Sequence, residues 1–353
     1  MLAEEQKDNG RVSPDSPIFA KDAFSREDDR DDTLFYETDR FVSHLDETAL
    51  ETVKHVIGYV IRTERPVVLD LMAGPDSHFP ATLKPGKAVG LGLNPSELQV
   101  NADLTETVIH DLNRDPVLPF PDHTFDAVVN TVSVDYMTRP VEVFREVRRV
   151  LKPGGIFLVV FSNRMFPQKA VKVWKEAGEG ERLILVHEFF QAAGGFEDGR
   201  EFVSMGRPRP RDDKYARMDI PSDPVFAVYA RTEGGDMAEP LPRVPAPPYG
   251  ASISSEELKE RKANIRETMR CPYCGETLRK WAVPDNPFCQ TWDCDFMYIC
   301  FNDACPYYVR GWDCMDEEGN RGMSYRLMYD REKDRCMPIP VPSHKALREG
   351  IVD

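Results

Sequence analysis

An acidic residue followed four positions later by a glycine stands at the end of an apolar run in Val67 to Ser77, VVLDLMAGPDS. In an open parallel sheet, the loop after the first strand faces the ligand crevice. Asp70 and Gly74 would therefore place a carboxylate and a backbone bare of side chain beside a nucleotide-like cofactor. Several classes of nucleoside cofactor share this local pattern, so the elements that follow must decide which one binds.

The cysteines are the second group able to do chemistry, and all eight lie between Cys271 and Cys336. The chain has no apolar leader and no apolar run near eighteen residues, so we expect a soluble, cytoplasmic protein. Clustered thiols in that compartment point to metal rather than disulfides. A C-x2-C-x25-C-x4-C pattern of four thiolates suits a structural, tetrahedral zinc ion and consists of Cys271, Cys274, Cys300 and Cys305.

A second ligand set stays open, because Cys289 and Cys294 have the same four-residue gap as Cys300 and Cys305. We favour the later pair, since the aromatic strand FMYIC would deliver Cys300 as the second hairpin of a zinc ribbon does. Over about forty residues this spacing resembles the Ogr/Delta-type zinc finger of phage transcription activators. Charge argues against DNA, because Cys271 to the end holds 14 acidic and 10 basic residues.

Strand and helix patterns alternate around the first motif. After Val67 to Leu71, β-branched and apolar runs predict strands over Lys87–Leu93, Thr107–Asp111, Phe125–Val134 and Ile156–Phe161. Val141 to Leu151 has apolar positions at helix spacing, and LKPGG then breaks that helix. Alternation of this kind predicts an α/β fold with a parallel sheet covered by helices on both faces.

On VVLDLMAG, AVGLGLNPSEL, LPFPDHTFDAVVNTVSVDYM and FREVRRVLKPGGIFLVVFSNR, the chain resembles the class I S-adenosylmethionine (SAM)-dependent methyltransferases of the type 11 group. The resemblance covers about half of the chain. It implies a Rossmann-like, seven-stranded sheet whose last two strands are 197–206 and 223–232. It also implies SAM as the cofactor, with binding positions at Asp70, Gly74, Asp76, Gly92, Asn94, Asp111, Leu112 and Asn130.

Two of these positions depart from the family pattern. Asp76 stands where a second glycine is usual, and Gly92 stands where a carboxylate normally accepts the ribose hydroxyls. Asn94 or Glu97 could supply that acceptor from the following turn, and Asp76 could meet the ammonium group of the methionine moiety. Loss of a charged hydrogen bond costs about 1.5 to 3 kcal/mol, or about tenfold to a hundredfold in binding.

Methyl transfer mainly requires alignment of the nucleophile and removal of its proton. We predict Asp135, Tyr136 and His44 as the catalytic candidates. A helical cap over 35–61 should close on the cofactor and contact substrate through Phe35, Tyr36 and Arg40. Because no cysteine precedes Cys271, and NTVSVDY replaces an NPPY-type motif, covalent pyrimidine methylation and amino methylation of nucleic acid are disfavoured.

Composition divides the chain into five parts. We expect an acidic, disordered tail (1–33), a methyltransferase-like domain (34–233), a proline-rich linker (234–253), a helix with the zinc ribbon (254–340) and a C-terminal tail (341–353). The net charge of −15 disfavours nucleic acid and anionic membranes as partners.

Three functions follow from these patterns. The first is a SAM-dependent methyltransferase for a small molecule or a protein side chain, with zinc as a structural ion. The second is a catalytically inactive scaffold whose zinc ribbon binds protein, and the third is a regulator that binds DNA through the ribbon. The sequence leaves the substrate and the oligomeric state open.

Overall fold

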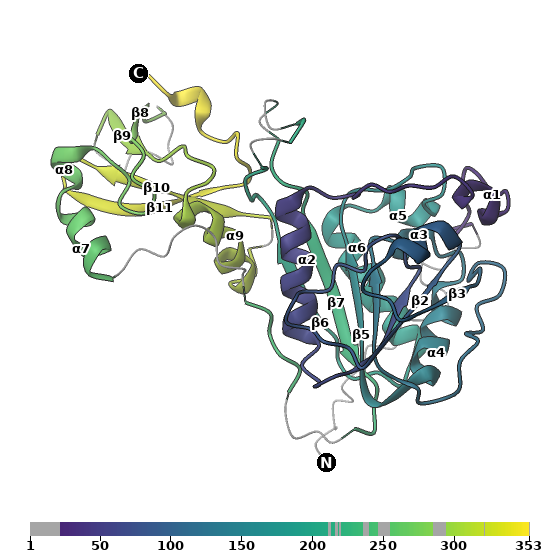
Figure 1. The fold of residues 1–353 in the computed structure, drawn as a ribbon. Helices are drawn as coiled ribbons and strands as arrows, with labels where there is room; N and C mark the ends of the chain where they lie inside the picture. The colour runs from purple at the N-terminus through teal and green to yellow at the C-terminus, as the bar shows by residue number, and fades with distance from the viewer. Residues whose placement is uncertain are drawn as a thin grey trace, which may run out of the picture. The chain divides into compact units, whose positions relative to one another are not determined.

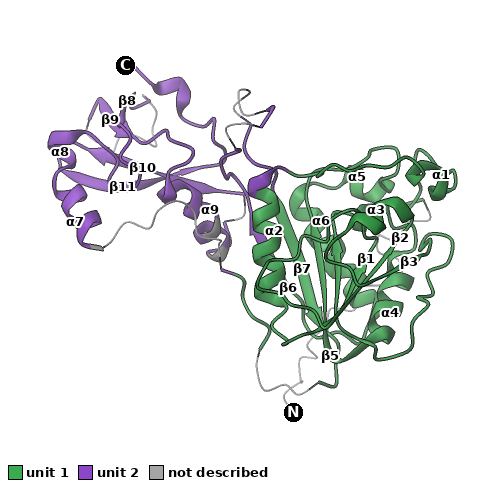
Figure 2. Cartoon of the chain, viewed as in Figure 1, with its two compact units in different colours: residues 1–45, 49–202, 225–244 green, residues 46–48, 203–224, 245–353 purple. Residues whose placement is uncertain are grey.

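The computed structural model of the chain describes residues 22–210, 213–215, 218, 220–235, 240–245, 255–284, 294–320 and 322–352. The chain divides into two compact units (Figure 2). Unit 1 comprises 1–45, 49–202 and 225–244, and unit 2 comprises 46–48, 203–224 and 245–353. Residues 46–48 and 203–224 are thus assigned to unit 2, although the boundaries expected from the sequence placed them in the methyltransferase-like domain.

Unit 1 is built on a seven-stranded sheet with the order β3-β2-β1-β4-β5-β7-β6 (Figure 1). Its strands are β1 (Val67–Leu71), β2 (Lys87–Gly92), β3 (Glu106–Ile109), β4 (Phe125–Thr131), β5 (Leu151–Phe161), β6 (Arg200–Ser204) and β7 (Val225–Arg231). The pairs among β1 to β5 are parallel, and β7 runs antiparallel to β5. The predicted fold class is therefore confirmed, including the position of the last two strands.

Helices cover both faces of this sheet. They are α1 (Asp32–Tyr36), α2 (Glu47–Val60), α3 (Pro95–Val100), the 3-10 turn η2 (Val134–Tyr136), α4 (Pro140–Val150), α5 (Lys172–Glu176) and α6 (Glu179–Ala193). Leu158 of β5 packs in one cluster with Val53 of α2. The preceding residue, Phe157, faces the other way and meets Phe144 of α4 and Phe190 of α6 at 4.7 and 5.3 Å between ring centroids. This alternation is the period of two expected for a strand buried on both sides.

The LKPGG segment differs from its predicted role as a plain break. Helix α4 ends at Val150 as expected, but residues 151–155 continue directly into β5. The pairing with β4 jumps from Phe125↔Leu151 to Ala127↔Ile156, which is a bulge. Gly154 takes φ 75° within it, a conformation that favours glycine.

Residues 22–33 are docked on unit 1, whereas the sequence predicted a solvated tail for them. The Lys169 side chain is completely buried and lies 3.0 Å from the Asp32 carboxylate. Arg26 donates to the same carboxylate at 2.8 Å, and Lys169 also donates to the backbone oxygen of Arg30 at 2.8 Å. Because a buried ammonium group must be paired, Lys169 fixes this segment in place. Residues 1–21 lie outside the described residues.

The described part of the predicted linker also packs on unit 1. Leu241 is buried in the core cluster that contains α2, with Val244 beside it. The Tyr229 hydroxyl donates to the backbone oxygen of Pro242 at 2.5 Å. Apolar side chains among the prolines therefore anchor 240–245.

Unit 2 contains a four-stranded sheet of order β11-β10-β9-β8. Its elements are α7 (Ser255–Ala263), α8 (Ile265–Thr268), β8 (Arg279–Ala282), β9 (Phe296–Ile299), α9 (Pro306–Glu317), β10 (Ser324–Asp330), β11 (Arg335–Val341) and the 3-10 turn η5 (Arg348–Gly350). Leu327 and Tyr329 face one apolar cluster while Met328 faces another, so both faces of β10 are buried. The predicted tail after residue 340 is held here, because Ile351 pairs with Trp281.

Across the described parts of both units, no helix combines the length and the apolar character needed to cross a bilayer.

Candidate functional site

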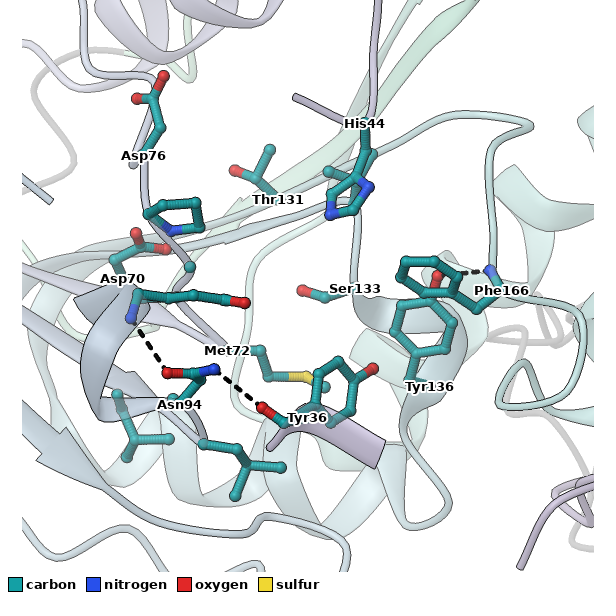
Figure 3. A pocket seen from close by; sticks show the side chains of 18 of the residues that line it. Tyr36, His44, Asp70, Met72, Asp76, Asn94, Thr131, Ser133, Tyr136 and Phe166 are labelled. Atoms are coloured by element: carbon teal, nitrogen blue, oxygen red, sulfur yellow. Dashed lines mark hydrogen bonds between the residues drawn. The ribbon is translucent and has the colours of Figure 1, made fainter. Parts of the chain in front are cut away.

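A cavity of about 540 Å³ lies at the carboxyl ends of the parallel strands of unit 1. Its walls come from the turns after β1, β2, β3 and β4, from residues 36 and 41–45, and from residues 164–166 (Figure 3). This is the edge at which open α/β sheets bind their ligands. The volume lies within the range of about 300 to 1,000 Å³ typical of small-molecule sites.

Asp70, the fourth residue of β1, is a buried carboxyl group in the wall of the cavity. Burial raises the pKa of Asp70 to about 7, against a smaller opposing effect of the hydrogen bond from Ser77. The Ser77 hydroxyl is in turn held by the Asn101 amide at 2.9 Å. A cation placed beside Asp70 would favour its ionised form, so this end of β1 suits a positively charged ligand.

Met72, in the turn after β1, has φ 62°, the left-handed region that glycine adopts most easily. Its side chain lies inside the cavity near Tyr36 (Figure 3). Val132, which follows β4 and also lines the cavity, has φ 44°. Left-handed backbone at a β-branched residue is strained, and strain of this kind concentrates at ligand sites.

Asp76 lines the cavity without filling it. Its side chain is 51% exposed and lies 3.1 Å from the His78 imidazole. That hydrogen bond is the main reason why the pKa of Asp76 falls to about 2. In Figure 3 the carboxylate stands at the edge of the cavity, on the far side from Tyr36 and Tyr136. The departure from glycine at this position therefore leaves room for a ligand.

The turns after β2 and β3 provide the opposite wall. Gly92, Asn94, Asp111 and Leu112, four of the positions that the sequence analysis assigned to a cofactor, all line the cavity. The Asp111 carboxylate accepts hydrogen bonds from the backbone of Asn113 at 2.9 Å and of Arg114 at 3.2 Å, which fixes the loop after β3. The Asn94 amide donates to the backbone oxygen of Tyr36 at 3.0 Å (Figure 3).

The remaining part of the cavity is aromatic. Tyr36, Tyr136 and Phe166 line it, and the Tyr136 hydroxyl accepts a hydrogen bond from the Phe166 backbone at 2.8 Å. His44 points into the same space, with its ring 5.3 Å from that of Phe166 (Figure 3). Desolvation by the surrounding protein, with smaller effects of Arg40 and His78, lowers the pKa of His44. A neutral imidazole in this position can accept a proton.

Four predicted residues lie behind the lining. Asp135 is buried, and burial raises the pKa of its carboxyl to about 8. Asn130 is buried and donates to the backbone oxygen of Leu71 at 2.9 Å, which ties β4 to β1. The Arg40 guanidinium stacks over the ring of Phe35 at 4.5 Å, next to Tyr36. None of the four is among the residues that line the cavity.

The structure adds lining residues that the sequence analysis did not single out. They are chiefly Phe41, Val42, Arg164, Met165 and Phe166. The position of the last three carried a usable signal, because the loop after β5 must emerge at the same sheet edge as the loops after β1 and β4. Residues 41–42 fall inside the segment 35–61 that was predicted as a helical cap, but that prediction is wrong for 37–46, which lie between α1 and α2 and are not helical.

Unit 2 holds the predicted cysteine cluster. The Sγ atoms of Cys271, Cys274, Cys300 and Cys305 all lie within 4.8 Å of one another. Cys271 and Cys305 are 3.8 Å apart, and Cys274 and Cys300 are 3.6 Å apart. Tetrahedral thiolates about 2.3 Å from zinc would be about 3.8 Å apart, so this donor set fits zinc. Of the alternative pair, Cys289 lies outside the described residues, and Cys294 is not part of the cluster.

Part of unit 1 is similar to known proteins. A family model described as a methyltransferase domain matches residues 69–159, which run from β1 to β5. A sterol 24-C-methyltransferase of Gibberella zeae is 34% identical over 90 residues, covering 23% of this chain and 24% of that protein. A ubiquinone/menaquinone biosynthesis C-methyltransferase of Roseobacter denitrificans is 30% identical over 131 residues, covering 36% of this chain and 48% of that protein.

A chain from the complex of the Haloferax volcanii Trm112 methyltransferase activator with a methyltransferase is 17% identical, with a TM-score of 0.39. The match covers 53% of this chain and 92% of that chain.

The protein described here spans about a quarter to a half of the length of the curated relatives that it matches. The sheet that forms the cavity therefore carries, in residues 69–159, a match to the methyltransferase domain family.

Proposed function

We propose that this protein is a SAM-dependent methyltransferase that acts on an apolar small molecule with a protic nucleophile. The observation that carries the proposal is the cavity at the carboxyl ends of β1, β2 and β4, inside the segment that matches the methyltransferase domain. Its residues fit the positive charge of SAM and leave the backbone of the chain within reach. Asp70 suits a cationic ligand, and Gly74 leaves the backbone bare on the cavity side.

When bound, SAM would supply a sulfonium methyl group, whose carbon–sulfur bond breaks with its electron pair returning to sulfur as the nucleophile bonds to carbon. The chain's own residues hold and orient the reactants. Asp70 and Asp111 would hold the cofactor, and Tyr36, Tyr136 and Phe166 would exclude water around the substrate. His44 would take the proton of the nucleophile, which its lowered pKa permits at neutral pH.

Exposed apolar side chains at the mouth of the cavity support an apolar substrate. Phe41, Val42 and Val100 line it while being 56%, 62% and 56% exposed. Apolar side chains gathered in the open beside a cavity mark a surface that binds apolar ligand. The names of the two curated relatives reported above agree, since they refer to a sterol and to ubiquinone or menaquinone.

The zinc ion is proposed as structural. Cys271, Cys300 and Cys305 are buried in one apolar cluster with Tyr308 and Leu327, so a metal there would complete the core of unit 2. A closed set of four thiolates leaves no open position for a reacting ligand. Thiolate ligands persist in reducing compartments, and a cytoplasmic location is part of the proposal for that reason.

Calorimetric titration with SAM, followed by transfer assays with SAM labelled in its methyl group, tests the function. We expect a dissociation constant below about 100 μM, and label that partitions into organic solvent when sterols, fatty acids or quinols are offered. Absence of SAM binding by a folded protein would favour the inactive scaffold. Binding of SAM with label found only on protein would overturn the substrate class.

A further inference from the structure

The end of β2 has no room for a side chain. A Cβ atom on Gly92 would lie 2.4 Å from the backbone oxygen of Ala73 and 3.3 Å from Leu98. Ala73 cannot retreat easily, because its N–H donates to the backbone oxygen of Leu91 at 2.8 Å. The position from which a carboxylate normally reaches the ribose of a bound nucleoside is therefore closed to aspartate and glutamate alike.

Asn94 is already committed to other partners. Its side-chain oxygen accepts the N–H of Glu97 at 3.1 Å. Its amide nitrogen donates to the backbone oxygen of Tyr36 at 3.0 Å and to the Asp39 carboxylate at 2.9 Å. The residue is 5% exposed. Asn94 therefore fastens residues 36–39 to α3 and has little left to offer a ligand.

Glu97, in the first turn of α3, is a further carboxylate that lines the cavity. One oxygen accepts the backbone N–H of Arg40 at 2.7 Å. The other, Oε2, lies 3.7 Å from the place where a Cβ of Gly74 would be, over the bare turn after β1. Among the described residues no donor is bonded to Oε2, and the residue is only 8% exposed. Desolvation by burial raises the pKa of Glu97, so donors supplied by a ligand would favour its ionised form.

We propose that Glu97 of α3, and not the end of β2, accepts the ribose hydroxyls of the cofactor, and that it thereby couples cofactor binding to the docking of residues 36–45. The inference rests on the proposed function. The Oε2 atom of Glu97 would accept the ribose hydroxyls, while the other carboxylate oxygen accepts the backbone N–H of Arg40. Residues 36 and 41–45 form a wall of the substrate side, so bound cofactor would complete the substrate pocket. Cofactor should bind first.

The decisive experiment pairs a variant of the protein with a variant of the ligand. Calorimetry would compare S-adenosylhomocysteine with its 2′-deoxy and 3′-deoxy analogues on the wild type and on Glu97→Gln. The wild type should lose about tenfold to a hundredfold in affinity when the recognised hydroxyl is removed. Glu97→Gln should bind the parent compound about tenfold to a hundredfold more weakly and distinguish the analogues less than the wild type does. The Arg40 N–H would hold the amide oxygen, and the amide nitrogen left facing the ribose cannot accept from a hydroxyl.

Glu106→Gln is the control, because Glu106 lies on β3 with a 58% exposed side chain that pairs with Lys87 away from the cavity. It should bind like the wild type. Unchanged affinity of Glu97→Gln, or discrimination between the analogues as strong as in the wild type, overturns this inference alone. Recovery of affinity by Gly92→Asp in the Glu97→Gln background would also overturn it. A wild type that binds no S-adenosylhomocysteine overturns the proposed function as well.

Hydrogen exchange tests the coupling without any catalysis. S-adenosylhomocysteine should slow exchange in peptides covering 36–46 of the wild type. Glu97→Ala removes the acceptor for the Arg40 N–H, so these peptides should exchange faster in the free protein and gain no protection from ligand. Peptides from β4 and β5 should exchange as in the wild type, which verifies the fold. Ligand-dependent protection of 36–46 in Glu97→Ala would contradict the coupling.

Discussion

Replacing Asp70 by asparagine should stabilise unit 1 and weaken cofactor binding at once. Burial raises the pKa of this carboxyl from 3.8 to about 7. Each pKa unit corresponds to about 1.36 kcal/mol, so a fully ionised Asp70 costs the folded protein about 4 kcal/mol. The asparagine side chain has a similar shape and no charge, and the side-chain hydrogen bond with Ser77 could be kept.

The sign of the pH dependence follows from the raised pKa. The folded protein holds the proton of Asp70 more tightly than the unfolded chain does, so stability from this group is complete below pH 3.8 and is lost as the pH rises to about 7. The asparagine variant does not titrate. Its advantage in free energy of unfolding should therefore be about 2 to 3 kcal/mol larger at pH 8 than at pH 5.

The assay must measure the unfolding of unit 1 separately from that of unit 2. Protein equilibrated in urea at pH 5 or pH 8 would receive a short deuterium pulse, and mass spectra of β1 and β4 peptides would give the folded fraction of unit 1. An advantage of equal size at both pH values would refute the argument that a buried charge is responsible. Calorimetry on the same variant should show weaker SAM binding, because the anion that faces the cation is lost.

Three further perturbations test other parts of the structure. Gly92→Ala should lower the melting temperature, because its Cβ would meet the Ala73 oxygen at 2.4 Å, whereas Gly180→Ala in α6, with nothing within 4 Å, should raise it slightly; calorimetric scans would show both signs. His44→Ala should reduce methyl transfer by about 10² to 10⁴ with SAM affinity unchanged. At saturating SAM, wild-type rates should fall only below pH 6.5, since the pKa of His44 is lowered. Removal of zinc by a chelator should unfold unit 2, because such sites contribute about 10 to 16 kcal/mol of folding free energy. Hydrogen exchange should then rise in β8 to β11 but not in β1 to β5. A rise in both units would show that the stabilisation by zinc is not confined to unit 2.

Much of the framework could be predicted from local patterns. The strands of the sheet are short apolar runs bounded by turn residues, and helix α4 has apolar residues at helix spacing, so each is readable from its own segment. The two-residue gap between Cys271 and Cys274 is enough by itself to predict a metal-binding knuckle. The choice of Cys300 and Cys305 as its partners was a preference, and the Sγ atoms of all four cysteines lie within 4.8 Å of one another in unit 2.

The contacts that shape the cavity and hold the segments around it could not be predicted from local sequence patterns. Arg40 and Glu97 are separated by 57 residues, and Lys169 meets the backbone of Arg30 across 139 residues, so no local period contains either contact. The sequence alone determined which segments of unit 1 become strands and where a carboxylate beside a bare turn and a thiolate cluster must lie. Only the tertiary structure decided that Gly92 has no space for a carboxylate and that Glu97 faces the bare turn instead, because both depend on how closely the chain after β1 approaches the chain after β2.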